Sequence, residues 1–136
     1  MAETDTDRCR GRLRHKGNRG LSRLWMACRN SWSGVLFAVR EESAFRQELM
    51  LTACLIPVAL VLPFNAFERL MLIGSLVLVL VVELLNSSIE AVVDRISFEH
   101  DGLSRRAKDY GSAAVTLTLF ACAVVWITLI WRLFSG

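Results

Sequence analysis

Three runs of apolar residues are separated by short polar stretches along most of the chain. They cover residues 49–64, 70–82 and 113–131, and the second continues as a mixed stretch to residue 96. A membrane-spanning helix needs about 20 mostly apolar residues. The pattern therefore predicts three spanning helices, at about 45–64, 69–96 and 108–134, and Pro57 marks a point where the first could kink.

A shorter periodic pattern precedes these runs. Over residues 21–40, apolar residues that include Trp25 and Trp32 recur at spacings of three and four, while Arg23 and Arg29 fall off that face. This spacing is typical of one face of a helix. Tryptophan on the apolar side and arginine on the polar side favour a helix lying in the membrane interface. A helix packed on a partner protein is the alternative.

Composition favours the same class. The chain has 136 residues, so one domain is expected, and 54% of them are hydrophobic, which is too many for a soluble domain of this size. We therefore predict an all-α membrane protein, with its membrane domain at 21–136. The four cysteines show no metal-like spacing, and His15 and His100 are isolated.

The first 20 residues form a basic arm. From Arg8 to Arg29 there are eight Lys or Arg and no Asp or Glu. Residues 1–20 lack an apolar period and are predicted to have no fixed structure. No apolar segment follows their basic residues directly, so they do not read as a signal peptide. Ahead of hydrophobic spans, such an arm favours an anionic membrane surface over nucleic acid, and a solvated tail that only marks the topology fits it equally well.

The distribution of Lys and Arg predicts the orientation of the helices. The arm and the second loop hold most of these residues, whereas the first loop holds only Arg69 and the C-terminus only Arg132. Because cytoplasmic loops are enriched in Lys and Arg, the N-terminus and the second loop are expected in the cytoplasm. The first loop and the C-terminus are then expected on the outer, periplasmic side.

A stripe of polar residues interrupts the apolar pattern of the second span. Glu83, Asn86, Glu90 and Asp94 are spaced by three, four and four residues, so they share one face of a helix. Asp94 suits a helix end that leaves the membrane. Glu83 follows thirteen uncharged residues, where an ionisable side chain costs several kcal/mol and marks a functional candidate.

Carboxylates with an amide, and without His or Cys, suit a particular chemistry. Mg²⁺ binds through one or two carboxylates together with substrate phosphates, and a further carboxylate can act as a base toward a hydroxyl. Other polar residues reach the same membrane side by topology, namely Glu42, Glu48, Lys108 and Asp109. The chain has no P-loop and no G-x-G-x-x-G motif, which excludes those nucleotide sites. A proton or cation carrier fits these residues nearly as well, and a structural membrane subunit is a third reading.

Three stretches carry a resemblance to a known family. They are "EESAFRQE", "VELLNSSIEAVVDRI" and "LSRRAKDYGSAAV". Together they resemble the signature stretches of prokaryotic diacylglycerol kinase, a small integral-membrane lipid kinase. The resemblance runs in register from about Leu21 to Phe134 and is highly specific.

The resemblance implies a fold and an activity. It implies a homotrimer of three-span subunits in the bacterial inner membrane, each with an interfacial N-terminal helix and with sites shared between neighbours. It implies transfer of the ATP γ-phosphate to the hydroxyl of diacylglycerol, with Mg²⁺, giving phosphatidic acid. A polyprenol (undecaprenol) kinase is the runner-up enzyme, because a related branch of the family acts on that alcohol.

The resemblance also carries over site residues. Glu83 resembles the catalytic base, Glu42 and Glu90 resemble the Mg²⁺-linked carboxylates, and Asn86 and Asp94 support them. The nucleotide contacts carry over to Arg23, Asn30, Glu42, Glu90, Glu99, His100, Asp101, Lys108 and Asp109. The lipid-substrate contacts carry over to Arg23, Ser31, Trp32, Ala44, Arg46, Gln47, Glu48, Glu83, Ser112 and Trp126. Two features depart from the family pattern: the arm is longer and more basic, and Asp101 stands where relatives usually have His.

Overall fold

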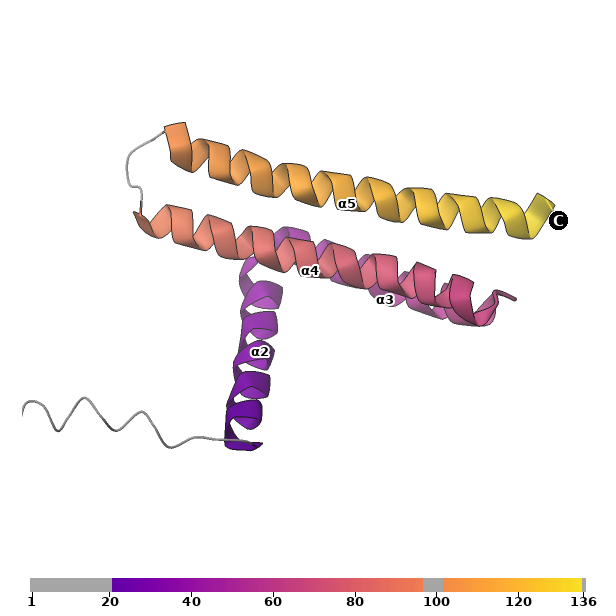
Figure 1. Ribbon diagram of the computed structural model, residues 1–136, viewed down its shortest axis with the longest axis horizontal. Helices are drawn as coiled ribbons and strands as arrows, with labels where there is room; N and C mark the ends of the chain where they lie inside the picture. Colours follow the sequence, from indigo (N-terminus) through magenta and orange to yellow (C-terminus); the bar gives the residue numbers. More distant parts are fainter. Residues whose placement is uncertain (1–20, 97–101, 136) are drawn as a thin grey trace, which may run out of the picture. The chain divides into compact units, whose positions relative to one another are not determined.

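The computed structural model describes residues 21–96 and 102–135, and nearly all of these residues lie in helices. The helices are α2 (Leu21–Glu41), α3 (Ser43–Val61), α4 (Ala66–Ile96) and α5 (Gly102–Ser135) (Figure 1). Residues 1–36 and 37–136 are two separate units, so the first four turns of α2 are described apart from the rest. The predicted all-helical class is confirmed.

Three helices are long and apolar enough to cross a membrane, namely α3, α4 and α5. α5 begins at Gly102, ahead of the span predicted from about residue 108, because polar residues continue the helix beyond its apolar part. α3 ends at Val61 instead of residue 64. Leu62 has extended backbone angles (φ −68°, ψ 148°), as expected for a residue that precedes a proline. Pro57 lies inside α3, where a membrane helix tolerates it.

The junction between α2 and α3 is a single extended residue, Glu42 (φ −97°, ψ 113°). Its backbone N–H still donates to the Ala38 carbonyl at 2.9 Å. The guanidinium Nη1 of Arg46 donates to the carbonyls of Val39 and Arg40, at 3.3 and 3.1 Å. Arg46 therefore satisfies carbonyls at the end of α2 that have no partner within the helix.

The turn between α3 and α4 is held by reciprocal hydrogen bonds. Asn65 Oδ1 accepts from the Glu68 N–H, and Glu68 Oε2 accepts from the Asn65 N–H, both at 2.9 Å. This capping box satisfies two backbone donors at the start of α4. Arg69 donates to the carbonyls of Ala59 and Leu62 at 3.1 and 3.4 Å, so it closes the end of α3.

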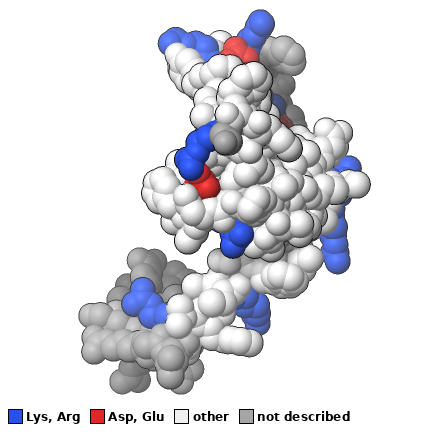
Figure 2. Space-filling model, turned by 90° about the vertical axis from the view of Figure 1, so that its right-hand side faces the viewer, with Lys and Arg blue, Asp and Glu red and all other residues white. Residues whose placement is uncertain are grey.

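α4 packs against both α3 and α5, which run along it (Figure 1). The buried apolar core joins all three helices and the first turn, through Ala59, Phe64, Leu72, Leu76, Val79, Cys122 and Trp126. Many large apolar side chains remain exposed, such as Leu85 (58%) and Phe120 (69%). Most of the face drawn in Figure 2 is uncharged, and its Lys, Arg, Asp and Glu gather in a few small groups. A surface of this kind suits a lipid environment.

Candidate active site

The C-terminal part of α4 carries the predicted stripe of polar side chains. Glu83, Asn86, Glu90 and Asp94 lie on one unbroken helix, so their spacing places them on one side of it. Glu83 is 4% exposed and Asn86 is 8% exposed, Glu90 is half-buried, and the side chain of Asp94 is 65% exposed. The stripe therefore begins with a buried carboxylate and ends with an exposed one.

Two carboxylates of the stripe, Glu83 and Glu90, lie near two others, Glu42 and Glu48. We call these four residues the carboxylate cluster. Glu90 and Glu42 both lie close enough to Glu83 for their negative charges to repel its carboxylate, and Glu83 repels Glu48 in the same way. None of the four forms an ion pair with Lys or Arg among the described residues. Because like charges repel, this cluster favours the arrival of positive charge.

Unpartnered atoms mark the same place. Glu48 Oε2 is buried and accepts no hydrogen bond from any described residue, and the same holds for Asn86 Oδ1. The amide Nδ2 of Asn86 donates to Glu90 Oε1 at 3.1 Å. Within the described residues, no three Asp, Glu, His or Cys side chains converge closely enough to hold a metal ion by themselves. The cluster therefore offers carboxylate oxygens but not a complete metal cage.

The N-terminal part of α5 brings a cation beside the stripe. Lys108 Nζ donates to Asp94 Oδ1 at 2.5 Å. Asp109 lies on the next position, exposed, with Arg105 Nε 4.0 Å from its carboxylate. Glu99, His100 and Asp101, predicted to contact the nucleotide, lie outside the described residues.

The other predicted residues are dispersed. Arg23, Asn30, Ser31 and Trp32 are exposed on α2, in the separate unit. Ala44 and Gln47 are exposed in the first turns of α3, and Ser112 is exposed on α5. Trp126 is 7% exposed within the apolar core, and its Nε1 has no hydrogen-bond partner. Neither Ser112 nor Trp126 belongs to the carboxylate cluster.

Two features escaped the sequence prediction. Gly111 of α5 lies directly against Asn86. At the N-terminal end of α4, Arg132 Nη1 is 2.7 Å from Glu68 Oε1, and the Glu68 side chain is only 10% exposed. The "S/T/D/N-x-x-E" spacing of Asn65 and Glu68 could have signalled the helix cap, but not the ion pair with Arg132. Contacts between helices depend on their register, which no local pattern reveals.

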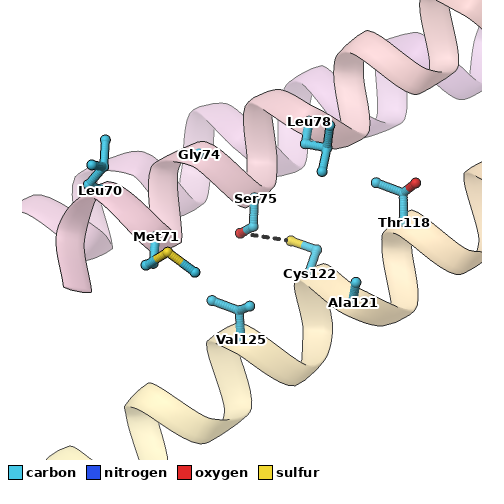
Figure 3. Close-up of a pocket in the computed structure, with 9 residues that line it drawn as sticks. All are labelled: Leu70, Met71, Gly74, Ser75, Leu78, Thr118, Ala121, Cys122 and Val125. Carbon is cyan, nitrogen blue, oxygen red and sulfur yellow. Dashed lines mark hydrogen bonds between the residues drawn. The ribbon is translucent and has the colours of Figure 1, made fainter. Parts of the chain in front are cut away.

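A pocket of about 390 Å³ lies between α4 and α5, away from the carboxylate cluster. Figure 3 shows its lining residues, Leu70, Met71, Gly74, Ser75, Leu78, Thr118, Ala121, Cys122 and Val125, with Cys122 Sγ donating to Ser75 Oγ at 3.4 Å. The lining has no Asp, Glu, Lys, Arg or His. The pocket therefore lacks groups for acid–base or phosphoryl chemistry, and the candidate active site is the carboxylate cluster.

Known proteins resemble this chain over most of its length. The family model described as prokaryotic diacylglycerol kinase matches residues 29–130. A diacylglycerol kinase of Pseudomonas aeruginosa is 48% identical over 115 residues, covering 85% of this chain and 94% of the relative. One of Escherichia coli is 44% identical over 116 residues, covering 85% and 95%. One of Haemophilus influenzae is 43% identical over 107 residues, covering 79% and 91%.

Proposed function

The chain belongs to the prokaryotic diacylglycerol kinase family, and on that premise we propose that it transfers the γ-phosphate of ATP to the free hydroxyl of diacylglycerol, giving phosphatidic acid and ADP. The observation that carries the proposal is the carboxylate cluster, whose members form no ion pair with Lys or Arg within the described residues. A buried Glu beside more exposed carboxylates suits a reaction between a membrane alcohol and a soluble nucleotide.

Glu83 is the proposed base. It is the most buried carboxylate of the stripe, on a helix long and apolar enough to span the membrane. Its carboxylate takes the hydroxyl proton as the lipid oxygen bonds to the γ-phosphorus. The bond between that phosphorus and the β,γ-bridging oxygen breaks, and ADP leaves with the electron pair. Positioned bases typically contribute about 10²- to 10⁴-fold in rate.

Glu90 and Glu42 are the proposed holders of Mg²⁺. The donor set fits this ion, because Mg²⁺ prefers carboxylate oxygens and uses only one or two of them alongside substrate phosphates. An incomplete cage among the described residues agrees with an ion that arrives with ATP. When bound, Mg²⁺ neutralises charge on the β- and γ-phosphates.

The nucleotide is proposed to bind beside the N-terminal part of α5. Lys108 pairs with Asp94 of the stripe, and its ammonium suits phosphate oxygens. Asp109, Arg23, Asn30 and the turn at 99–101 complete the proposed nucleotide contacts. Ser31, Trp32, Ala44, Arg46, Gln47, Glu48, Ser112 and Trp126 are the proposed lipid contacts, and Arg46 also closes the end of α2.

We place the protein in the bacterial inner membrane as a homotrimer with sites shared between subunits. The three apolar helices support the membrane location. The Glu48 oxygen that is buried without a hydrogen-bond partner among the described residues supports a site that a neighbouring subunit completes. The N-terminus and second loop are proposed to face the cytoplasm and the C-terminus the periplasm, with residues 1–20 as a basic arm outside a membrane domain at 21–136. Cross-linking in detergent micelles should stop at three chains; a ladder ending at one or two would exclude the trimer.

A two-substrate assay tests the activity. Purified protein in mixed micelles receives labelled ATP with either diacylglycerol or undecaprenol. Label should pass to diacylglycerol, only when a divalent cation is present. Label found on undecaprenol alone would identify a polyprenol kinase. Label on neither, with proton or cation flux in vesicles, would identify a carrier.

A further inference from the structure

Gly111 marks a point where α5 approaches the polar stripe of α4 very closely. A Cβ placed on Gly111 would overlap Oδ1 of Asn86 and lie 3.2 Å from its Cγ. Gly111 and Asn86 are both buried, and an added Cβ would force the Asn86 amide to shift from its position. Cβ atoms placed on Gly34, Gly74 or Gly102 would meet nothing within 4 Å. Of these four glycines, only Gly111 could not gain a side chain without displacing a neighbouring side chain.

The side chain that lies against Gly111 belongs to Asn86, which is hydrogen-bonded to Glu90. Asn86 Nδ2 donates to Glu90 Oε1 at 3.1 Å, while Asn86 Oδ1 is buried and has no hydrogen-bond partner in the described part of the chain. A buried, unpaired amide oxygen is costly, so stability alone does not favour this arrangement. The Asn86 amide is therefore held by its hydrogen bond to Glu90 on one side and by contact with Gly111 of α5 on the other.

We propose that Gly111 is a positioning residue: its missing side chain seats the Asn86 amide, which orients the Glu90 carboxylate for Mg²⁺·ATP. The inference rests on the proposed role of Glu90. Lys108 lies one turn earlier on α5 and pairs with Asp94, the residue one turn beyond Glu90. Residues of α5 therefore contact both polar neighbours of Glu90 in the stripe: Gly111 contacts Asn86, and Lys108 pairs with Asp94. Partners that orient a metal ligand typically change metal affinity 10- to 100-fold.

The rival explanation is that Gly111 serves helix packing and nothing else. Any buried glycine brings two helices closer, and replacing it would then harm folding whether or not Asn86 is present. Under the proposal, replacing Gly111 lowers stability and Mg²⁺ affinity only when the Asn86 side chain is present. A double-mutant cycle separates the two, since it isolates the coupling between a pair of residues.

The experiment compares Gly111→Ala, Asn86→Ala and the double variant with the wild type. Gly74→Ala is the matched control, because it makes the same change in α4 where nothing lies within 4 Å. Two quantities are measured: the Mg²⁺ concentration that half-saturates binding of a non-hydrolysable ATP analogue, and the thermal unfolding midpoint in micelles without ligand.

Gly111→Ala should raise the half-saturating Mg²⁺ concentration about 10-fold in the wild-type background and leave it unchanged in the Asn86→Ala background. Its unfolding midpoint should fall by roughly 4 °C with Asn86 present and not fall without it. Equal effects in both backgrounds, or effects no larger than those of Gly74→Ala, would overturn the proposal.

Two further outcomes are decisive. If Gly111→Ala fails to fold, the double variant should fold, because the overlap is gone; a double variant that also fails would assign Gly111 to packing alone. The unfolding cycle uses no substrate, so it stands even if the wild type fails to phosphorylate diacylglycerol. Loss of the proposed function and loss of this inference are therefore distinguishable.

Discussion

Lys108 of α5 and Asp94 of α4 form an ion pair with 2.5 Å between Nζ and Oδ1. The pair joins the C-terminal part of α4 to the N-terminal part of α5. The side chains are 40% and 65% exposed, and exposed pairs contribute only about 0–1 kcal/mol to stability. The main effect of the pair is therefore to position the Lys108 ammonium group beside the stripe, and its contribution to the free energy of unfolding is small.

Lys108→Ala should separate these two roles. We expect the KM for ATP to rise about 10-fold or more, because a cation beside the phosphates is lost, with a stability loss of about 1 kcal/mol or less. Arg106→Ala is the control, since Arg106 is exposed and donates to the exposed Tyr110 hydroxyl at 3.3 Å. An unchanged KM with a large fall in stability would make Lys108 a structural residue.

Glu90→Gln keeps the size of the side chain and removes its charge. We expect activity to fall at least 10-fold at ordinary Mg²⁺ and to recover partly when Mg²⁺ is raised, because a proposed ligand of the ion is weakened. The same is expected of Glu42→Gln. Glu41→Gln, at the exposed neighbouring position, is the control. Normal turnover of both variants at ordinary Mg²⁺ would refute the ligand assignment.

Glu68 and Arg132 form the counterpart pair near the opposite ends of the helices, at 2.7 Å. Glu68 also accepts from the Asn65 N–H, so Glu68→Gln removes an ion pair and weakens a helix cap. Because its side chain is only 10% exposed, we expect a loss of about 1–3 kcal/mol in the free energy of unfolding. Turnover below the unfolding temperature should be normal. A stable variant with slow turnover would contradict this.

Deleting residues 1–20 tests the basic arm. Activity should remain largely intact, because none of the proposed site residues lies there. Anionic lipid should help the complete chain more than the shortened one, since each Lys or Arg near such a surface gains about 1 kcal/mol. A folded but inactive shortened protein would place the arm in the site.

Local pattern accounts for the helices and for the polar face of α4. The apolar runs predicted α3, α4 and α5, and the spacing of Glu83 and Glu90 predicted one polar face. The early start of α5 was missed because hydropathy reports the bilayer-spanning part, whereas a polar segment can be helical too. Gly111 and the Glu68–Arg132 pair were missed because the register between two helices is set by packing of the whole bundle.

Glu83→Gln is the decisive variant, examined by single-turnover phosphoryl transfer together with ATP-analogue binding. A neutral amide cannot take the hydroxyl proton, so the chemical step should slow by about 10²-fold or more. Nucleotide binding with Mg²⁺ should persist, because Glu42 and Glu90 remain. Stability should be equal or higher, since an ionised group buried in a membrane helix is costly. A well-folded variant that binds the nucleotide but does not transfer phosphate is the predicted result. Lost nucleotide binding, with residual turnover that tracks the Mg²⁺ concentration, would instead make Glu83 a metal ligand and not the base.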